Sequence, residues 1–209
     1  MRSVGLISFY RSYKMLQTVL LWFRANYVEL FGMVFGIVYI FFSIRQNIWL
    51  WPIGLITSIF YIVIFFTSKL YADMSLQIYY LVISIYGWIH WLYGKQKSES
   101  GELRVLKTSV KSWMTVFAGT TVLSILIAWI LKNYTDSPLP WWDAFLTASS
   151  IMATWMLAQK YLENWLVWIV VDAISIGVFA YKELYLTCIL FLVYTIMAIK
   201  GYFEWKKSL

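Results

Sequence analysis

Two residues in an apolar part of the sequence have the types and spacing expected of a ligand site. Asp172 is the ionisable residue nearest the middle of the run WLVWIVVDAISIGVFAY, and Trp168 precedes it by four residues. In a helix, side chains four residues apart lie on the same face. A carboxylate only accepts hydrogen bonds, and an indole ring attracts cations. The pair predicts a site for a flat, cationic, hydrogen-bond-donating ligand; the alternative is a polar group that joins packed helices.

A second set of polar side chains has helical spacing in another apolar run. Gln77, Tyr80 and Ser84 occupy positions i, i+3 and i+7 and therefore share one face. A glutamine inside a bilayer needs hydrogen-bond partners, which are either another helix or a ligand. We expect Gln77 and Tyr80 to complete the site of Trp168 and Asp172 from a different group of helices.

The composition indicates a membrane protein. Of the 209 residues, 62% are hydrophobic and 13% are charged, whereas soluble domains are usually about 45–50% apolar and about 25% charged. This balance excludes a water-soluble enzyme, a disordered regulator and a nucleic-acid-binding domain. Because the sequence has one cysteine, Cys188, and one histidine, His90, we expect no disulfide framework, no catalytic metal and no cofactor.

Seven apolar runs approach the length of a membrane-spanning helix, which is about 20 residues. They cover residues 27–43, 46–68, 74–94, 112–131, 142–159, 164–181 and 184–205. Residues 1–26 mix basic residues with Leu, Phe, Tyr and Trp, which is typical of an amphipathic segment at a membrane surface. The sequence predicts an all-α integral membrane protein that begins with this segment.

The chain repeats itself, because residues 29–91 match residues 143–205 at a constant offset of 114. The matched pairs include Trp51 with Trp165, Gly87 with Gly201, and Trp91 with Trp205. Each repeat holds three runs, and the run 112–131 lies between them, so both repeats have the same orientation (3+1+3). We expect a three-helix bundle in residues 27–94, a loop and linker helix in 95–141, and a second bundle with a short tail in 142–209. Parallel repeats of this kind enclose a central pathway in transporters.

The repeat sets the Trp168 and Asp172 pair apart from its surroundings. At the same offset Trp168 corresponds to Gly54 and Asp172 to Ser58, so only the second repeat carries a ring and a charge. We expect one ligand, held mainly by the second repeat against a cleared surface of the first.

Two further aromatic residues are predicted to line the pathway. Tyr194 corresponds to Tyr80 at the repeat offset. Trp51, next to Pro52 at the start of a run, is more typical of an interfacial anchor, and a lining or gating role is the alternative. The candidate substrate-binding residues are therefore Trp168, Asp172, Gln77, Tyr80, Tyr194 and Trp51.

The basic residues indicate an orientation in the membrane. With seven spans, ten of the 17 Lys and Arg residues lie on the side of the C-terminus, several of them in the loop 95–111. Cytoplasmic loops are enriched in Lys and Arg, so we expect this loop and the C-terminus in the cytoplasm. The net charge of +7 then reflects topology and contacts with membrane lipid rather than nucleic acid.

The two repeats contain the elements LYAD at 70–73, QxYY at 77–80, IYGWxxW at 85–91 and ENWLxW at 163–168. With these elements the chain resembles the Pnu family of bacterial vitamin transporters over all seven runs. The resemblance implies the SWEET-like fold, a homotrimer in the bacterial inner membrane, and facilitated diffusion. It also implies that net uptake depends on phosphorylation of the vitamin by a cytoplasmic kinase.

The resemblance also bears on the substrate. Family members that carry nicotinamide riboside typically have a Trp-x-x-x-Asn motif in the sixth span, where this chain has Trp168 and Asp172. An asparagine side chain donates and accepts hydrogen bonds, whereas a carboxylate only accepts them. The amine and thiazolium charge of thiamine suit Asp172, although nicotinamide riboside is also cationic. We expect uptake of a cationic aromatic vitamin, thiamine first and nicotinamide riboside as the alternative.

Other classes of function fit the sequence less well. An intramembrane enzyme needs a nucleophile with a base, or a metal, and the apolar runs supply neither. A structural or receptor-like membrane protein would not need a repeat with an asymmetric polar pair. Ion-coupled transport stays open, because Asp172 is a single deep titratable group.

Overall fold

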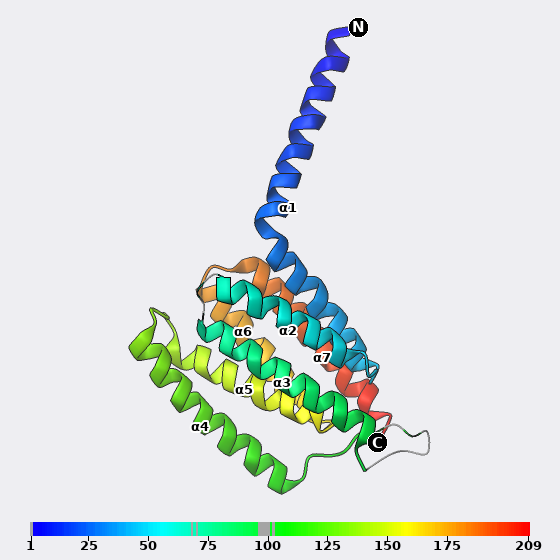
Figure 1. Ribbon diagram of the computed structural model, residues 1–209, viewed down its shortest axis with the longest axis vertical. Helices are drawn as coiled ribbons and strands as arrows, with labels where there is room; N and C mark the ends of the chain where they lie inside the picture. Colours follow the sequence, from blue (N-terminus) through cyan, green and yellow to red (C-terminus); the bar gives the residue numbers. More distant parts are fainter. Residues whose placement is uncertain (1, 68, 70, 96–100, 102) are drawn as a thin grey trace. The chain divides into compact units, whose positions relative to one another are not determined.

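The computed structural model describes residues 2–67, 69, 71–95, 101 and 103–209, and its regular structure there is helical (Figure 1). The helices are α1 (Arg2–Ile44), α2 (Leu50–Thr67), α3 (Tyr71–Tyr93), α4 (Val110–Tyr134), α5 (Pro140–Ala158), α6 (Asn164–Tyr181) and α7 (Tyr185–Lys206). In these ranges the β-structure is one isolated bridge, between Leu106 and Tyr161. The prediction of an all-α protein is confirmed.

The chain divides into two units, residues 1–36 and residues 37–209. In the first unit the described residues belong to α1, where Phe31 stacks on Phe35 with ring centroids 4.1 Å apart. Helix α1 begins at Arg2 and continues to Ile44, so the predicted segment 1–26 passes into the first apolar run without a break. The second unit contains the end of α1, all later helices and the buried core.

Four helices of the described chain are long and apolar enough to cross a membrane. They are α2, α4, α6 and the part of α7 from Thr187 to Lys206, and Leu30–Ile44 is a shorter apolar stretch. Four of the seven predicted spans therefore meet this criterion. Helices α3 and α5 carry more polar side chains in their middle, such as Gln77 in α3 and Thr154 in α5, which lowers their hydropathy.

The later helices of the second unit pack in pairs. Helix α2 packs on α3, α6 on α7, and α4 on α5. Helix α5 also contacts α3 and α6, so it joins the first pair of helices to the second. Among α2–α7, α4 contacts α5 alone.

The sequence repeat extends to the backbone. In the ranges that the structure describes, the non-glycine residues with positive φ are Gln46 (54°), Lys69 (59°), Lys160 (59°) and Glu183 (60°). They form two pairs with the repeat offset, Gln46 with Lys160 and Lys69 with Glu183. Each pair follows the end of corresponding helices, where a left-handed residue is a common way to stop a helix.

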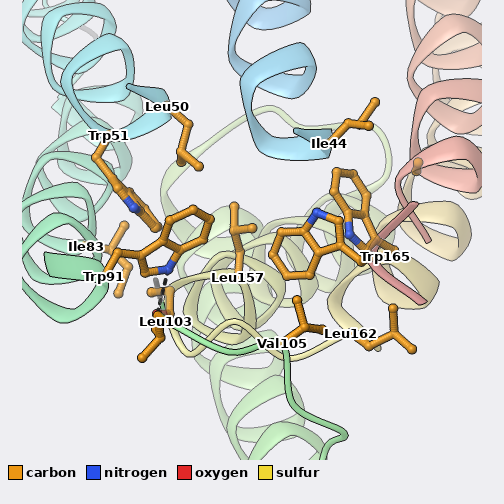
Figure 2. Close-up of a cluster of buried hydrophobic side chains, with 13 residues drawn as sticks. Ile44, Leu50, Trp51, Ile83, Trp91, Leu103, Val105, Leu157, Leu162 and Trp165 are labelled. Atoms are coloured by element: carbon orange, nitrogen blue, oxygen red, sulfur yellow. Dashed lines mark hydrogen bonds between the residues drawn. The ribbon is translucent and has the colours of Figure 1, made fainter. Parts of the chain in front are cut away.

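Four tryptophans form the centre of the core in the second unit: Trp51, Trp91, Trp165 and Trp205. Within the first repeat, Trp51 and Trp91 meet edge to face with centroids 5.5 Å apart. Within the second, Trp165 and Trp205 meet in the same way at 5.6 Å. The ring centroids of Trp91 and Trp205 lie 6.2 Å apart, so the two repeats meet at these rings. The four tryptophans are called the tryptophan cluster below. Figure 2 shows Leu157 between Trp91 and Trp165.

Two glycines make room for these rings. A Cβ atom at Gly87 would overlap the ring of Trp51, and one at Gly201 would lie 2.7 Å from the ring of Trp165. The Gly-x-x-x-Trp element of each repeat thus receives the tryptophan of the preceding helix. Trp51 is fully buried, so it is not the interfacial anchor that its position next to Pro52 suggested.

Two hydrogen bonds cross between the repeats at the tryptophan cluster. Trp91 Nε1 in α3 donates to the carbonyl oxygen of Ala158 at the end of α5, at 3.2 Å. Trp205 Nε1 in α7 donates to the carbonyl oxygen of Ser43 at the end of α1, at 2.9 Å. The third helix of each repeat therefore binds the first helix of the other repeat.

Candidate functional site

Trp168 and Asp172 both lie in α6, and they follow Trp165 of the tryptophan cluster along this helix. Trp168 is partly buried and packs against both the hydrophobic core that contains the tryptophan cluster and a second cluster of Leu146, Val171 and Val178. Asp172 is one turn further along α6, and its side chain is 4% exposed. No hydrogen bond or ion pair links its carboxylate to another residue that the structure describes. The alternative of a helix-packing group hydrogen-bonded to a Tyr or Ser thus finds no partner there.

A tyrosine from another helix lies near this carboxylate, and a second tyrosine lies near the first. Tyr194 of α7 interacts electrostatically with Asp172 and with Tyr61 of α2. Sequence reasoning named Tyr194 and missed Tyr61, which follows Ser58, the counterpart of Asp172, by one helical turn. The structure therefore brings α6 and α7 together at Asp172, the one buried carboxyl group of these two helices, and Tyr61 of α2 lies near Tyr194.

The first repeat contributes a group of tyrosines. Tyr80 of α3 packs against the hydrophobic core that contains the tryptophan cluster, and it lies near Tyr39 of α1. The neighbouring Tyr79 donates its hydroxyl to the carbonyl oxygen of Ile151 in α5, at 2.7 Å. Gln77 is partly exposed, and its amide has no hydrogen-bond partner within the described ranges.

The sequence predicted an empty surface around Gly54, and this prediction is wrong because other side chains occupy that space. A Cβ atom at Gly54 would lie 2.9 Å from Ser84 Oγ and 3.2 Å from Tyr39 Cε2, so Tyr39 fills this place. At the repeat offset Tyr39 corresponds to Ala153, just as Gly54 corresponds to Trp168. Each repeat thus carries one ring and one small residue, with the two positions exchanged, and both rings pack on the hydrophobic core that contains the tryptophan cluster.

Buried polar side chains occur inside α2, α3, α5 and α6, and Asp172 is the ionisable one among them; the buried Lys160 lies in the turn between α5 and α6. Ser58, Ser84, Asp172 and Ser175 are each at most 4% exposed. Helices α2, α3, α5 and α6 contain no Lys or Arg. The described residues include no group of three His, Cys, Asp or Glu side chains that holds a metal. This arrangement suits a cationic or neutral ligand with hydrogen-bond donors, and a flat one because Trp168 and Tyr39 supply rings.

Comparison with known proteins identifies the family. A family model described as nicotinamide mononucleotide transporter matches residues 26–207. The chain belongs to this family. The predicted membership of the Pnu transporters is therefore confirmed, and the chain is a multi-pass membrane protein of a transporter family rather than of an enzyme family.

Relatives of known substrate are similar over most of their length. The nicotinamide riboside transporter PnuC of Escherichia coli (strain K12) is 27% identical over 207 residues, covering 88% of this chain and 86% of that protein. The PnuC of Neisseria mucosa is 29% identical, with 83% of this chain and 70% of that protein covered. The riboflavin/roseoflavin transporter RibM of Streptomyces davaonensis is 22% identical, with 85% and 83% covered.

A solved structure shares the fold. The crystal structure of the vitamin B3 transporter PnuC superposes with a TM-score of 0.68 and 24% sequence identity, and the match covers 93% of this chain and 87% of that one. None of the relatives named here carries thiamine in its name, so the preference for thiamine receives no support from them. The nicotinamide riboside alternative agrees better with these names.

Proposed function

We propose that this chain is a transporter of the bacterial inner membrane that carries nicotinamide riboside between its two repeats. The observation that carries the proposal is the match to this family and to relatives named as nicotinamide riboside transporters, and the buried carboxyl group of Asp172, one turn from Trp168, is the candidate site. Nicotinamide riboside has a flat pyridinium cation, a carboxamide that donates hydrogen bonds, and ribose hydroxyls. These are the features that an acceptor-only carboxylate beside an indole recognises.

Each predicted site residue then has a role toward this substrate. Trp168 stacks on the pyridinium ring, and Asp172 accepts from the carboxamide or a hydroxyl while offsetting the ring's charge. Gln77 and Tyr80 bind from the first repeat, and Tyr194 supports Asp172 from α7, which its electrostatic interaction with that carboxylate favours. Trp51 acts in the tryptophan cluster, at the end of the pathway.

The charge of the site favours the riboside over its phosphate ester. A phosphate group near Asp172 would face α2, α3, α5 and α6, which contain no Lys or Arg, and the buried Lys160 lies outside these helices, in the turn between α5 and α6, where it donates to Leu103 O. Burying a charge without a cationic partner is costly, and Asp172 adds a charge of the same sign. Nicotinamide mononucleotide is therefore expected to bind more weakly than nicotinamide riboside.

For the assembly and mechanism we propose the 3+1+3 arrangement, with α3, α5 and the end of α1 also crossing the membrane and α4 as the linker. The fact that α4 packs on α5 alone among α2–α7 supports this. The loop 95–111 and the C-terminus lie in the cytoplasm. The two bundles of each subunit rock about the site to give alternating access. Transport is facilitated diffusion, and the chain forms a homotrimer. A cytoplasmic kinase phosphorylates the vitamin and so retains it in the cell.

The test is calorimetric binding to the purified full-length protein in detergent, with nicotinamide riboside, thiamine, riboflavin and nicotinamide mononucleotide. We expect nicotinamide riboside to bind most tightly and the mononucleotide at least tenfold more weakly. Tighter binding of thiamine would overturn the substrate assignment and restore the thiamine alternative. Absence of binding by all four compounds would overturn vitamin transport and favour a structural or receptor-like protein.

A further inference from the structure

A short segment of the long polar loop is buried at the end of the site's pathway. The loop 95–111 is mostly polar, yet Leu103 and Val105 are each 5% exposed and belong to the core that contains the tryptophan cluster. Figure 2 shows Leu103 below Trp91, and Val105 on the side of Trp165. The segment of residues 103–108, called the closing segment below, thus covers rings from both repeats.

Backbone hydrogen bonds attach the closing segment to the turn between α5 and α6. Leu106 N donates to Lys160 O at 3.0 Å, and Leu162 N donates to Leu106 O at 2.8 Å. These two bonds form the parallel bridge between Leu106 and Tyr161. An attachment through two bonds is local, so it is separable without unfolding a helix.

Side chains of the second repeat hold both ends of the closing segment. The carboxylate of Glu163 accepts from Thr108 N at 2.7 Å and from Thr108 Oγ1 at 2.6 Å. The buried Lys160 Nζ donates to Leu103 O at 2.6 Å and lies 4.7 Å from the centroid of the Trp91 ring. Lys160 therefore connects the closing segment to the first repeat as well.

The closing segment lies between the repeats and on the path to the site. Leu103 packs at the end of α3, where a Cβ atom on Gly94 would lie 2.7 Å from Leu103 Cδ1. The closing segment also bonds Leu162 and Glu163, which directly precede α6. At 1.5 Å per residue, Asp172 lies about 10 Å further along α6 than Trp165. In the proposed pathway, a substrate that leaves Asp172 toward this end passes the tryptophan cluster and the closing segment.

With the closing segment in this position, two indole N–H donors at corresponding positions of the two repeats have no hydrogen-bond acceptor among the described residues. Trp51 Nε1 and Trp165 Nε1 are buried, and neither has an acceptor among the described residues. An unpaired buried donor disfavours the state that contains it. Withdrawal of the closing segment would open the cluster and give both indoles access to water or to substrate hydroxyls.

We propose that residues 103–108 are the gate at the C-terminal end of the pathway, and that Leu103 and Val105 must leave the tryptophan cluster each time substrate passes. Glu163 and Lys160 are positioning residues that hold the gate closed. This inference rests on the proposed function, because it names the part of the chain that controls access to the same site.

The first test locks the gate. Residues paired in a parallel bridge lie about 4.8 Å apart, within the range of roughly 4.4–6.8 Å between the Cα atoms of a disulfide. The test protein carries two cysteines, through Leu106→Cys and Tyr161→Cys, in a Cys188→Ser background. It is oxidised in proteoliposomes, and the uptake of labelled nicotinamide riboside is measured. We expect oxidation to lower uptake at least tenfold, a reductant to restore it, and each single-cysteine variant to be insensitive. Uptake within twofold of the reduced protein, with the cross-link complete by mass spectrometry, would overturn the proposal.

The second test follows gate opening without transport. Leu103→Cys in the Cys188→Ser background is labelled with a water-soluble maleimide, with and without Glu163→Gln. Because the amide accepts more weakly than the carboxylate, we expect labelling to be at least threefold faster in Glu163→Gln. Glu204→Gln, at an exposed pair with Lys207, is the matched control and should leave the rate unchanged. Equal labelling rates with and without Glu163→Gln would show that the closing segment does not move and would overturn the gate. Absence of nicotinamide riboside binding by the unmodified protein would overturn the proposed function instead.

Discussion

Replacement of Asp172 by alanine tests the chemistry of the site. Asp172 is 4% exposed, and its carboxylate forms no hydrogen bond or ion pair with a residue that the structure describes, so we expect its main interaction to be with the substrate. A hydrogen bond to a charged group contributes about 1.5–3 kcal/mol, and about 1.4 kcal/mol corresponds to a tenfold change in affinity. Asp172→Ala is therefore expected to weaken binding of nicotinamide riboside by about tenfold to 150-fold.

The stability of the unliganded protein separates this effect from misfolding. Burying a charge without a partner is unfavourable, so Asp172→Ala should leave the melting temperature in detergent unchanged or raised. Asp172→Asn keeps the shape and adds a donor for the carboxamide oxygen. It should therefore retain more affinity for nicotinamide riboside than for thiamine.

The assay is calorimetric titration of the three proteins with both vitamins, together with thermal unfolding of the unliganded proteins. Affinities within twofold of the unchanged protein in both variants would refute the reasoning and make Asp172 a structural residue. A lowered melting temperature in Asp172→Ala would show that the carboxylate has a protein partner after all.

Three further predictions follow from the rings and their packing. Trp168→Ala should weaken nicotinamide riboside binding by about threefold to thirtyfold, since cation–π contacts contribute about 0.5–2 kcal/mol, and Trp168→Phe should lose less; equal affinities in calorimetry would exclude stacking. Gly87→Ala should destabilise the protein by about 1–3 kcal/mol, because the added methyl overlaps Trp51. Thermal unfolding checks this against Gly177→Ala, whose Cβ would have no neighbour within 4 Å, and equal losses would contradict it. Trp205→Phe should cost about 0.5–1.5 kcal/mol for the lost bond to Ser43 O, and an unchanged melting temperature would show that this bond contributes nothing.

The helices and the repeat were largely predictable from the sequence. The run 164–181 coincides with α6, because polar residues bound a continuous apolar stretch on both sides. The repeat predicted that Trp51 corresponds to Trp165 and Gly87 to Gly201, and the structure adds that the ring of Trp51 packs against Gly87. A periodic pattern fixes which residues are equivalent, but it does not tell which of them touch.

The missed features depend on contacts between distant parts of the chain. Tyr39 and Tyr61 are ordinary aromatic residues in apolar runs, so nothing in their local sequence distinguishes them from lipid-facing neighbours. Leu103 and Val105 are two apolar residues in a polar stretch, too short a pattern to predict burial. Their burial depends on the turn between α5 and α6, which lies about fifty residues further along the chain.

Uptake by proteoliposomes that contain only the purified chain tests the central claim most directly. Labelled nicotinamide riboside is added outside vesicles that contain the unlabelled compound. We predict saturable entry of the label that is faster than into vesicles loaded with buffer and that ionophores do not change. Entry no faster than into protein-free vesicles would contradict the account, and entry that requires an ion gradient would contradict facilitated diffusion.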